Sequence, residues 1–193
     1  MAQRIIGLTG GIATGKSSVA AYLESRYELP ILDADLYARD AVKPGSVALT
    51  NIVHRYGAEI LLANGHLDRK QLGNIVFNDK SERAWLEGQI HPYVRERILS
   101  TQRQLANPVI VTVVPLLFEA KLTDLVTEIW VVVCSEEQQC QRLMQRDSIS
   151  QSQAEARVAS QMPMMEKASR GTVVLYNDAD CPYLYVQVDQ AIN

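Results

Sequence analysis

The residues best suited to chemistry stand near the N-terminus, where residues 10–17 read GGIATGKS. This spacing matches the phosphate-binding loop G-x-x-x-x-G-K-[ST], the P-loop. Its glycines let the backbone curl so that successive N–H groups point at phosphate oxygens. Lys16 is expected to reach the β- and γ-phosphates, and the Ser17 hydroxyl to be a ligand for Mg²⁺. The motif predicts binding of a nucleoside triphosphate and leaves the reaction open.

Two carboxylates could act on a phosphoryl acceptor. Asp33 and Asp35 follow a predicted strand, at the edge where doubly wound sheets bind ligands. Asp33 follows the strand directly, so it is the favoured residue to take a proton from an acceptor hydroxyl or to orient it. The alternative is that one of the two only caps the next helix.

Three arginines stand late in the chain. Arg142 and Arg146 are four residues apart on one predicted helix and share a face, and Arg157 comes from the next helix. Such a hairpin, at about residues 138–162, could fold over a triphosphate and neutralise charge that develops during transfer. The alternative is a solvated basic face paired with Glu137 or Asp147.

A polar pair also occurs inside a predicted helix. His91 and Arg95 lie one turn apart, beside Pro92 and off an apolar stripe formed by Leu86, Ile90, Val94 and Ile98. They either face an anionic acceptor or belong to a kinked helix with a surface histidine.

The P-loop alone leaves three classes of protein open: a switch GTPase, an ATP-driven hydrolase or motor, and a small-molecule kinase. The N-K-x-D motif of guanine-specific GTPases has no match, since the late candidate NDAD at residues 177–180 lacks the lysine. The chain is also short for a motor. Asp33 and the arginines favour a kinase of a nucleotide or another small metabolite over a nucleotide-dependent switch or a binding module without an acceptor.

The elements that must position these residues alternate along the chain. Apolar runs predict strands at residues 4–9, 29–32, 108–114, 128–134 and 172–177. A helix is expected at residues 16–27, and capping boxes at Ser135 and Ser150 begin helices to about residues 146 and 162. The order β-α-β, helical insert, β-α-β-α-α-β predicts an α/β fold: a doubly wound parallel sheet of about five strands, with a helical insert at about residues 36–107.

The composition argues against several classes of binding partner and site. The net charge is -3 with 21% charged residues, which argues against a nucleic-acid or membrane-surface binder. Cys134, Cys140 and Cys181 fit no zinc or disulfide framework. A signal-peptide pattern and a membrane-length apolar segment are both missing. We expect a cytoplasmic monomer or small homo-oligomer.

Taken in order, these motifs resemble the dephospho-coenzyme A kinase family, which uses ATP to phosphorylate the ribose 3′-hydroxyl of dephospho-coenzyme A. The resemblance runs along nearly the whole chain. It rests on IIGLTGGIATGKSSVA (5–20), DAD (33–35) with AR (38–39), HP (91–92) with VR (94–95), VPLLFE (114–119), and RLMQRD (142–147) continuing to AEARVASQM (154–162). It implies a nucleotide-binding core, a helical substrate domain and an arginine-bearing lid.

The resemblance also implies roles for single residues. ATP and Mg²⁺ would be bound by Gly10, Gly11, Ile12, Ala13, Thr14, Gly15, Lys16, Ser17 and Ser18, with Arg146 and Asn177 also contacting the nucleotide. Lys16, Asp33, Arg142 and Arg146 would be catalytic, with Asp33 as the base. The acceptor would contact Asp33, His91, Arg95, Leu117, Phe118, Glu119, Arg157 and Gln161.

Two departures from the family pattern occur near the C-terminus. The family commonly has an Ala-Asp pair before the last strand and a glycine shortly after its asparagine, but this chain has Gly171-Thr172 and Asn177-Asp178-Ala179. Side-chain contacts to adenine in this segment are therefore not carried over, although Asn177 itself is retained. The C-terminal segment CPYLYVQVDQAIN (181–193) is short, and a long closing helix is not expected there.

Overall fold

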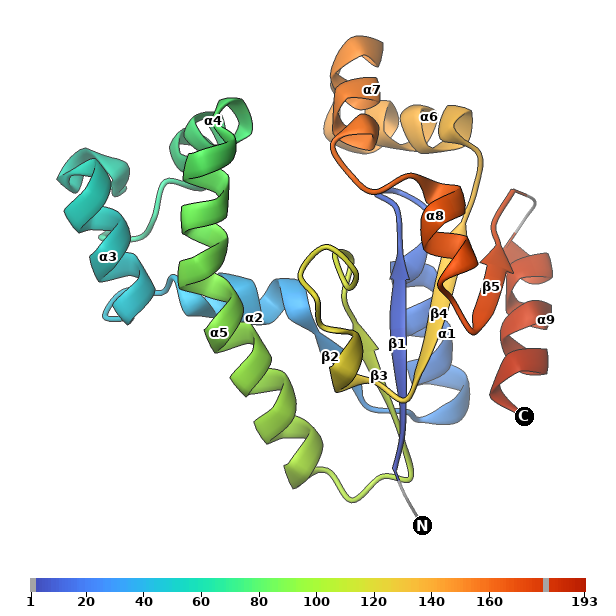
Figure 1. Cartoon of the computed structure of the whole chain (residues 1–193). Helices are drawn as coiled ribbons and strands as arrows, with labels where there is room; N and C mark the ends of the chain where they lie inside the picture. The colour runs from blue at the N-terminus through green and yellow to red at the C-terminus, as the bar shows by residue number, and fades with distance from the viewer. Residues whose placement is uncertain (1–2, 179–180) are drawn as a thin grey trace. The chain divides into compact units, whose positions relative to one another are not determined.

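The computed structural model describes residues 3–178 and 181–193 of the chain. In this part, five strands form one parallel sheet in the order β2-β3-β1-β4-β5 (Figure 1). Their bounds are β1 Arg4–Gly10, β2 Ile31–Asp33, β3 Val109–Val113, β4 Glu128–Val133 and β5 Val173–Tyr176. The predicted α/β fold with a doubly wound parallel sheet is confirmed, with strand ends moved by one or two residues.

The chain divides into two compact units, of which the first joins Met1–Asp33 to Gln102–Asn193 and the second is Ala34–Thr101. The second unit contains α2 (Ala34–Ala41), α3 (Val47–Tyr56), the 3₁₀ turn η1 (Ala58–Ile60), α4 (Arg69–Asn78) and most of α5 (Lys80–Gln104). It has its own hydrophobic core, in which Ile52 and Ile60 are fully buried. Among the described residues, no helix is both long and apolar enough to cross a bilayer.

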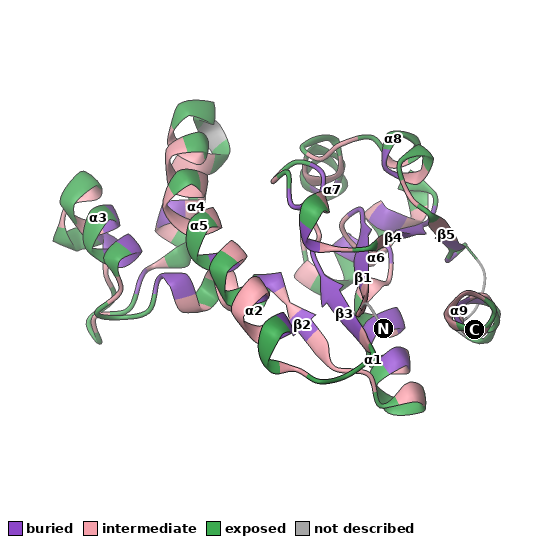
Figure 2. Ribbon diagram, turned by 60° about the horizontal axis from the view of Figure 1, so that its bottom comes forward, coloured by how far each residue is buried: buried purple, intermediate pink, exposed green. Residues whose placement is uncertain are grey.

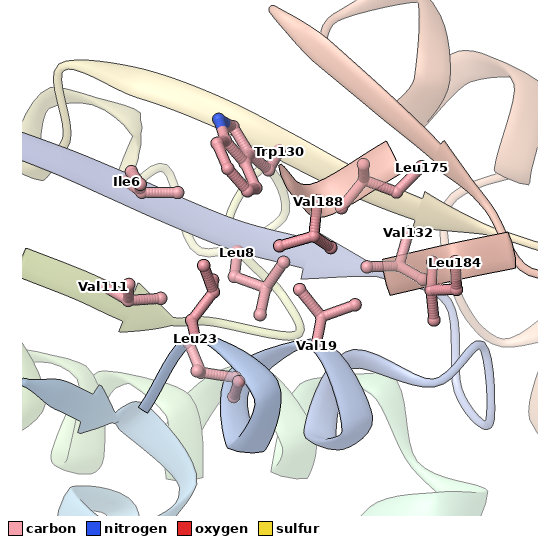
Figure 3. Packing of buried hydrophobic residues seen from close by; sticks show 12 residues of the cluster. Ile6, Leu8, Val19, Leu23, Val111, Trp130, Val132, Leu175, Leu184 and Val188 are labelled. Atoms are coloured by element: carbon pink, nitrogen blue, oxygen red, sulfur yellow. The ribbon is translucent and has the colours of Figure 1, made fainter. Parts of the chain in front are cut away.

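The sheet of the first unit is buried on both faces, as the purple strands of Figure 2 show. Along β4, Trp130 and Val132 point to the face covered by α1 (Lys16–Tyr27) and α9 (Cys181–Ile192) (Figure 3). Val131 and Val133 point to the opposite face and pack with residues of α8 (Met164–Ser169). Successive strand residues face opposite sides, so a strand covered on both faces needs an unbroken apolar run.

The helix predicted between the third and fourth strands is wrong. Turns and one 3₁₀ turn, η2 (Thr123–Leu125), make this connection. Lys121 has a φ of 53°, which a non-glycine residue adopts rarely and which interrupts a helix. Four apolar residues of this segment are nevertheless buried: Leu117, Phe118, Leu122 and Leu125.

The expectation of no long closing helix is also wrong, because α9 is 12 residues long. Leu184 and Val188 lie one turn apart and are fully buried against the sheet and α1. Tyr185 stacks on Tyr22 of α1, with ring centroids 4.1 Å apart. The helix is therefore stabilised by tertiary packing, which short helices generally require.

A carboxylate completes the contact between α9 and α1. Asp189 accepts hydrogen bonds from the hydroxyls of Tyr27 (2.7 Å) and Tyr22 (2.8 Å). These hydrogen bonds, with the Tyr27 one contributing most, hold the pKa of Asp189 below its ordinary value. The same carboxylate raises the pKa of both tyrosines.

Replacement Asp189→Asn should lower the thermal midpoint of unfolding at pH 7, because the amide is a weaker acceptor for the two hydroxyls. The pKa of Asp189 is lower when folded than the value of about 3.9 in an unfolded chain, so its stabilisation is present above about pH 5 and is lost as the pH falls through the folded pKa. The difference between wild type and variant should therefore shrink in thermal melts at pH 3. Exposed Glu24→Gln on α1 is the matched control, and a difference that stays constant with pH would contradict the assignment.

Candidate active site

The P-loop connects β1 to α1 through a backbone that only small residues allow. Gly10 and Gly15 have φ values of 146° and 103°. A Cβ at Gly10 would lie 2.3 Å from the Val132 carbonyl oxygen, and one at Gly15 would lie 2.2 Å from Asn177 Nδ2. Glycine is thus required here by both conformation and space.

Side-chain donors hold five successive carbonyl groups of this loop. The Lys16 ammonium donates to Gly10 O (3.1 Å) and Gly11 O (2.7 Å). The next three carbonyls accept from Gln139 Nε2 at Ile12 O (2.6 Å), Arg142 Nη1 at Ala13 O (3.4 Å) and Asn177 Nδ2 at Thr14 O (2.7 Å). The C=O and N–H of one peptide group point in opposite directions, so these bonds turn the N–H groups of Gly11, Ala13 and Gly15 away from the donors. The other two N–H groups already donate within the protein, that of Ile12 to Gln161 Oε1 (2.7 Å) and that of Thr14 to Gly11 O (3.4 Å).

This arrangement suits an anion of the size of a phosphate. The start of α1 adds N–H groups without intrahelical acceptors and the positive end of the helix dipole, with no acidic residue in its first turn. The Ser17 hydroxyl is exposed there, while Ser18 N–H already donates to Gly15 O. Among the described residues, no group of three His, Cys, Asp or Glu could hold a metal by itself. The role of Ser17 as a ligand for Mg²⁺ stays a prediction.

Asp33 lies at the same edge of the sheet as the P-loop. It ends β2 and pairs with Val113 of β3, which in turn pairs with Leu8 of β1. The P-loop begins two residues after Leu8, so the parallel sheet brings Asp33 and Gly10 to the same carboxyl edge. At β1 the direction of the connections across the sheet reverses, and ligands of such sheets bind at this point. Asp35 is exposed in the first turn of α2, a position that favours a negative charge at a helix start.

The arginine hairpin consists of α6 (Glu136–Asp147) and α7 (Gln151–Ala159). Both begin with the predicted serine caps, but only Ser150 forms a full capping box, and α7 ends before the predicted residue 162. Asp147 accepts from Arg146 Nε (2.7 Å) and Arg157 Nη1 (2.5 Å). The hydrogen bond from Arg146 contributes most to holding the pKa of Asp147 below its usual range.

Arg142 has a different environment from the other two. Its guanidinium donates to Ala13 O, to Asn177 O (2.9 Å) and to Gln138 Oε1 (2.8 Å). These contacts connect the P-loop to the end of β5. In this structure Arg142 thus supports the loop backbone, and its catalytic role toward the phosphates stays a prediction.

Two residues predicted to contact ligands bind the P-loop backbone in this structure, and their ligand contacts stay predictions. Asn177 is buried and donates from Nδ2 to Thr14 O. Gln161 follows α7 and its Oε1 accepts from the Ile12 N–H (2.7 Å). Thr14 is buried and its hydroxyl donates to Gly11 O (3.0 Å). All three therefore determine the shape of the loop.

The segment after β3 forms an ion pair with a buried lysine of α8 that the sequence analysis missed. Lys167 is fully buried and its Nζ lies 2.9 Å from Glu119 Oε1 and 3.1 Å from Pro115 O. Burial alone would raise the pKa of Glu119, but the hydrogen bond from Lys167 brings this pKa below its ordinary value. Leu117 and Phe118 have buried side chains, and their contact with an acceptor stays a prediction.

Two further predictions concern other parts of the chain. His91 and Arg95 lie on α5 in the second unit, half-buried beside the buried Val94, and their role toward a substrate stays a prediction. In the altered segment, Thr172 forms hydrogen bonds with both backbone groups of Ile129 and so positions the chain just before β5. Ala179 and Asp180 lie outside the described residues.

Comparison with known proteins assigns this site to a family. Residues 4–182 match the family model described as Dephospho-CoA kinase. A Dephospho-CoA kinase from Trichormus variabilis is 56% identical over 193 residues, covering 100% of this chain and 98% of that protein. The chain belongs to the dephospho-CoA kinase family.

Solved structures agree with this membership. A crystal structure from Thermus thermophilus has a TM-score of 0.86 at 32% identity and covers 100% of this chain and 97% of that one. A dephospho-CoA kinase from Campylobacter jejuni has a TM-score of 0.71 at 26% identity, covering 99% and 96%. The predicted family is thus confirmed, and the chain is a kinase, a transferase whose family uses ATP.

Replacement Asn177→Ala should destabilise the fold by about 1–3 kcal/mol, because it leaves the buried Thr14 carbonyl without its donor. The measurement is the free energy of unfolding in urea. The control is Asn107→Ala, whose side chain is exposed. Equal stability of the two variants would show that the Asn177 amide does not support the loop.

Proposed function

We propose that this enzyme transfers the γ-phosphoryl group of ATP to the ribose 3′-hydroxyl of dephospho-coenzyme A, giving coenzyme A and ADP. The observation that carries the proposal is the placement of Asp33 and the P-loop at one carboxyl edge of the sheet. Membership of the dephospho-CoA kinase family supports the choice of acceptor. The P-loop and the start of α1 supply the site for the phosphoryl donor, and Asp33 supplies a carboxylate for the attacking hydroxyl.

In the proposed reaction the 3′-oxygen forms a bond to the γ-phosphorus while the bond from that phosphorus to the bridging oxygen of ADP breaks. Asp33 either accepts the hydroxyl proton itself or orients the hydroxyl while solvent accepts the proton. Lys16 and the N–H groups of the loop stabilise the negative charge of the phosphates. Ser17 would hold Mg²⁺, which when bound neutralises charge on the β- and γ-phosphates.

The remaining assignments are part of the same proposal. Arg146 and Arg157 would exchange Asp147 for phosphate oxygens, since a guanidinium binds carboxylate and phosphate by the same planar geometry. His91 and Arg95 would hold the nucleotide end of the acceptor. Glu119 would also contact the acceptor. We infer a cytoplasmic location, which is consistent with the free thiols of Cys134 and Cys140, and a monomer or small homo-oligomer.

The test of the proposed function is the release of ADP from MgATP with and without dephospho-coenzyme A. We expect release to depend on the acceptor and coenzyme A to form in equal amount. Release that is independent of the acceptor would indicate an ATPase or switch. Transfer only to a nucleotide or another small alcohol would indicate a different P-loop kinase.

Replacement Asp33→Asn should lower kcat by about 10²-fold or more while the dissociation constant for ATP stays unchanged. The reason is that the substitution removes the carboxylate that serves the acceptor hydroxyl and leaves the ATP site unaltered. The measurement is steady-state turnover beside calorimetric titration with ATP. Asp35→Asn, in the first turn of α2, is the matched control and should retain turnover. Near-normal turnover of the Asp33 variant would reduce this residue to a structural one.

A further inference from the structure

Two glutamines hold the two peptide groups on either side of Ile12 in the P-loop. Gln161 Oε1 accepts from the N–H of the Gly11–Ile12 peptide (2.7 Å). Gln139 Nε2 donates to the C=O of the Ile12–Ala13 peptide (2.6 Å). Both glutamines belong to the arginine hairpin or its continuation, more than 120 residues away in sequence. The hairpin is thus attached directly to the phosphate-binding loop.

The chemistry of the two bonds fixes which amide atom is used. A peptide N–H requires an acceptor, so Gln161 must present its oxygen, and a peptide C=O requires a donor, so Gln139 must present its nitrogen. Gln139 is only 2% exposed, which leaves its amide no access to bulk water as an alternative partner. A carboxylate could therefore replace the amide at position 161 but not at position 139.

The conformation of the next residue explains why such holding is needed. Ala13 has a φ of 59°, in the left-handed region that costs free energy for a residue with a Cβ. Rotation of the Ile12–Ala13 peptide would relieve this cost and turn the Ala13 N–H away from its present direction. The bond from Gln139 to Ile12 O opposes that rotation, as expected where surrounding contacts maintain a strained backbone at a functional site.

We propose that Gln139 and Gln161 are positioning residues for phosphoryl transfer: together they fix the two peptides around Ile12, so that the Ala13 N–H faces the phosphate side and the arginine hairpin is coupled to the loop. The inference rests on the proposed function only in taking ATP as the ligand. Neither side chain needs to touch the nucleotide.

Two features make the test practical. A cavity of about 280 Å³ borders both glutamines and Gly11, so a replaced side chain has room to move without disrupting the core. Gln141 lies on the same helix α6, is exposed and does not contact the loop, which makes Gln141→Leu the matched control.

The first measurement is the dissociation constant for MgATP by calorimetry, without acceptor. Gln139→Leu should weaken binding about tenfold, the size expected for loss of one well-placed hydrogen bond, whereas Gln141→Leu should bind as wild type. Gln139→Glu should be weaker still, because its carboxylate faces the Ile12 carbonyl. Since no acceptor is present, failure here is distinguishable from failure of the acceptor-dependent assay.

A second replacement separates positioning from packing. Adding Ala13→Gly to Gln139→Leu should recover ATP affinity by about threefold, because glycine adopts positive φ without the penalty of a Cβ. A purely structural role of Gln139 would give no recovery. ATP affinity of Gln139→Leu equal to wild type, or double and single variants with equal affinity, would overturn the proposal.

Position 161 provides an independent arm with a readout besides nucleotide binding. Gln161 is only partly buried, so its variants are expected to fold. Hydrogen exchange of the Ile12 amide, measured by NMR on the full chain without ligand, should accelerate at least about tenfold in Gln161→Leu and stay slow in Gln161→Glu. Equal exchange rates in wild type and Gln161→Leu would show that this bond does not hold the loop.

Discussion

The outward anchoring of the P-loop carbonyls is the constraint on which the rest of the site depends. Backbone N–H groups bind an anion only if their peptides are turned the right way, and a glycine-rich loop has little preference of its own. Here Lys16, Gln139, Arg142 and Asn177 supply donors to the five carbonyls from Gly10 to Thr14. The binding site is therefore oriented before any nucleotide arrives, which reduces the ordering cost of binding.

The sheet makes these donors meet. Strands β1, β4 and β5 run parallel, so the P-loop, the start of α6 and Asn177 all follow strand ends at one edge. Burial of Trp130 and Val132 on one face and of Val131 and Val133 on the other fixes the register of β4 against both neighbours. A slip by one residue would exchange the two faces and displace α6 from the loop.

Charged pairs around the site have two different characters. The pairs of Asp147 with Arg146 and Arg157 are partly exposed to solvent, which screens them, so they orient side chains and contribute little to stability. The pair of Lys167 with Glu119 is different, because the lysine is fully buried and would be an uncompensated charge without its carboxylate. This ion pair fixes α8 to the segment that follows β3, and so helps determine the path of that segment.

The sequence by itself determined the features that depend on neighbouring residues: the P-loop motif, helix α1 over residues 16–27, the cap at Ser150 and the buried apolar strands. The ordered motifs also gave the family. The tertiary structure decided which polar residues serve the loop. Gln139 and Lys167 look like ordinary helix residues in the sequence, and Gln161 was predicted to contact the acceptor and not the loop. The reason is that the groups they contact lie some 50 to 150 residues away. Helix α9 likewise forms because Leu184, Val188 and Asp189 find partners on the sheet and α1, and no local pattern encodes those partners.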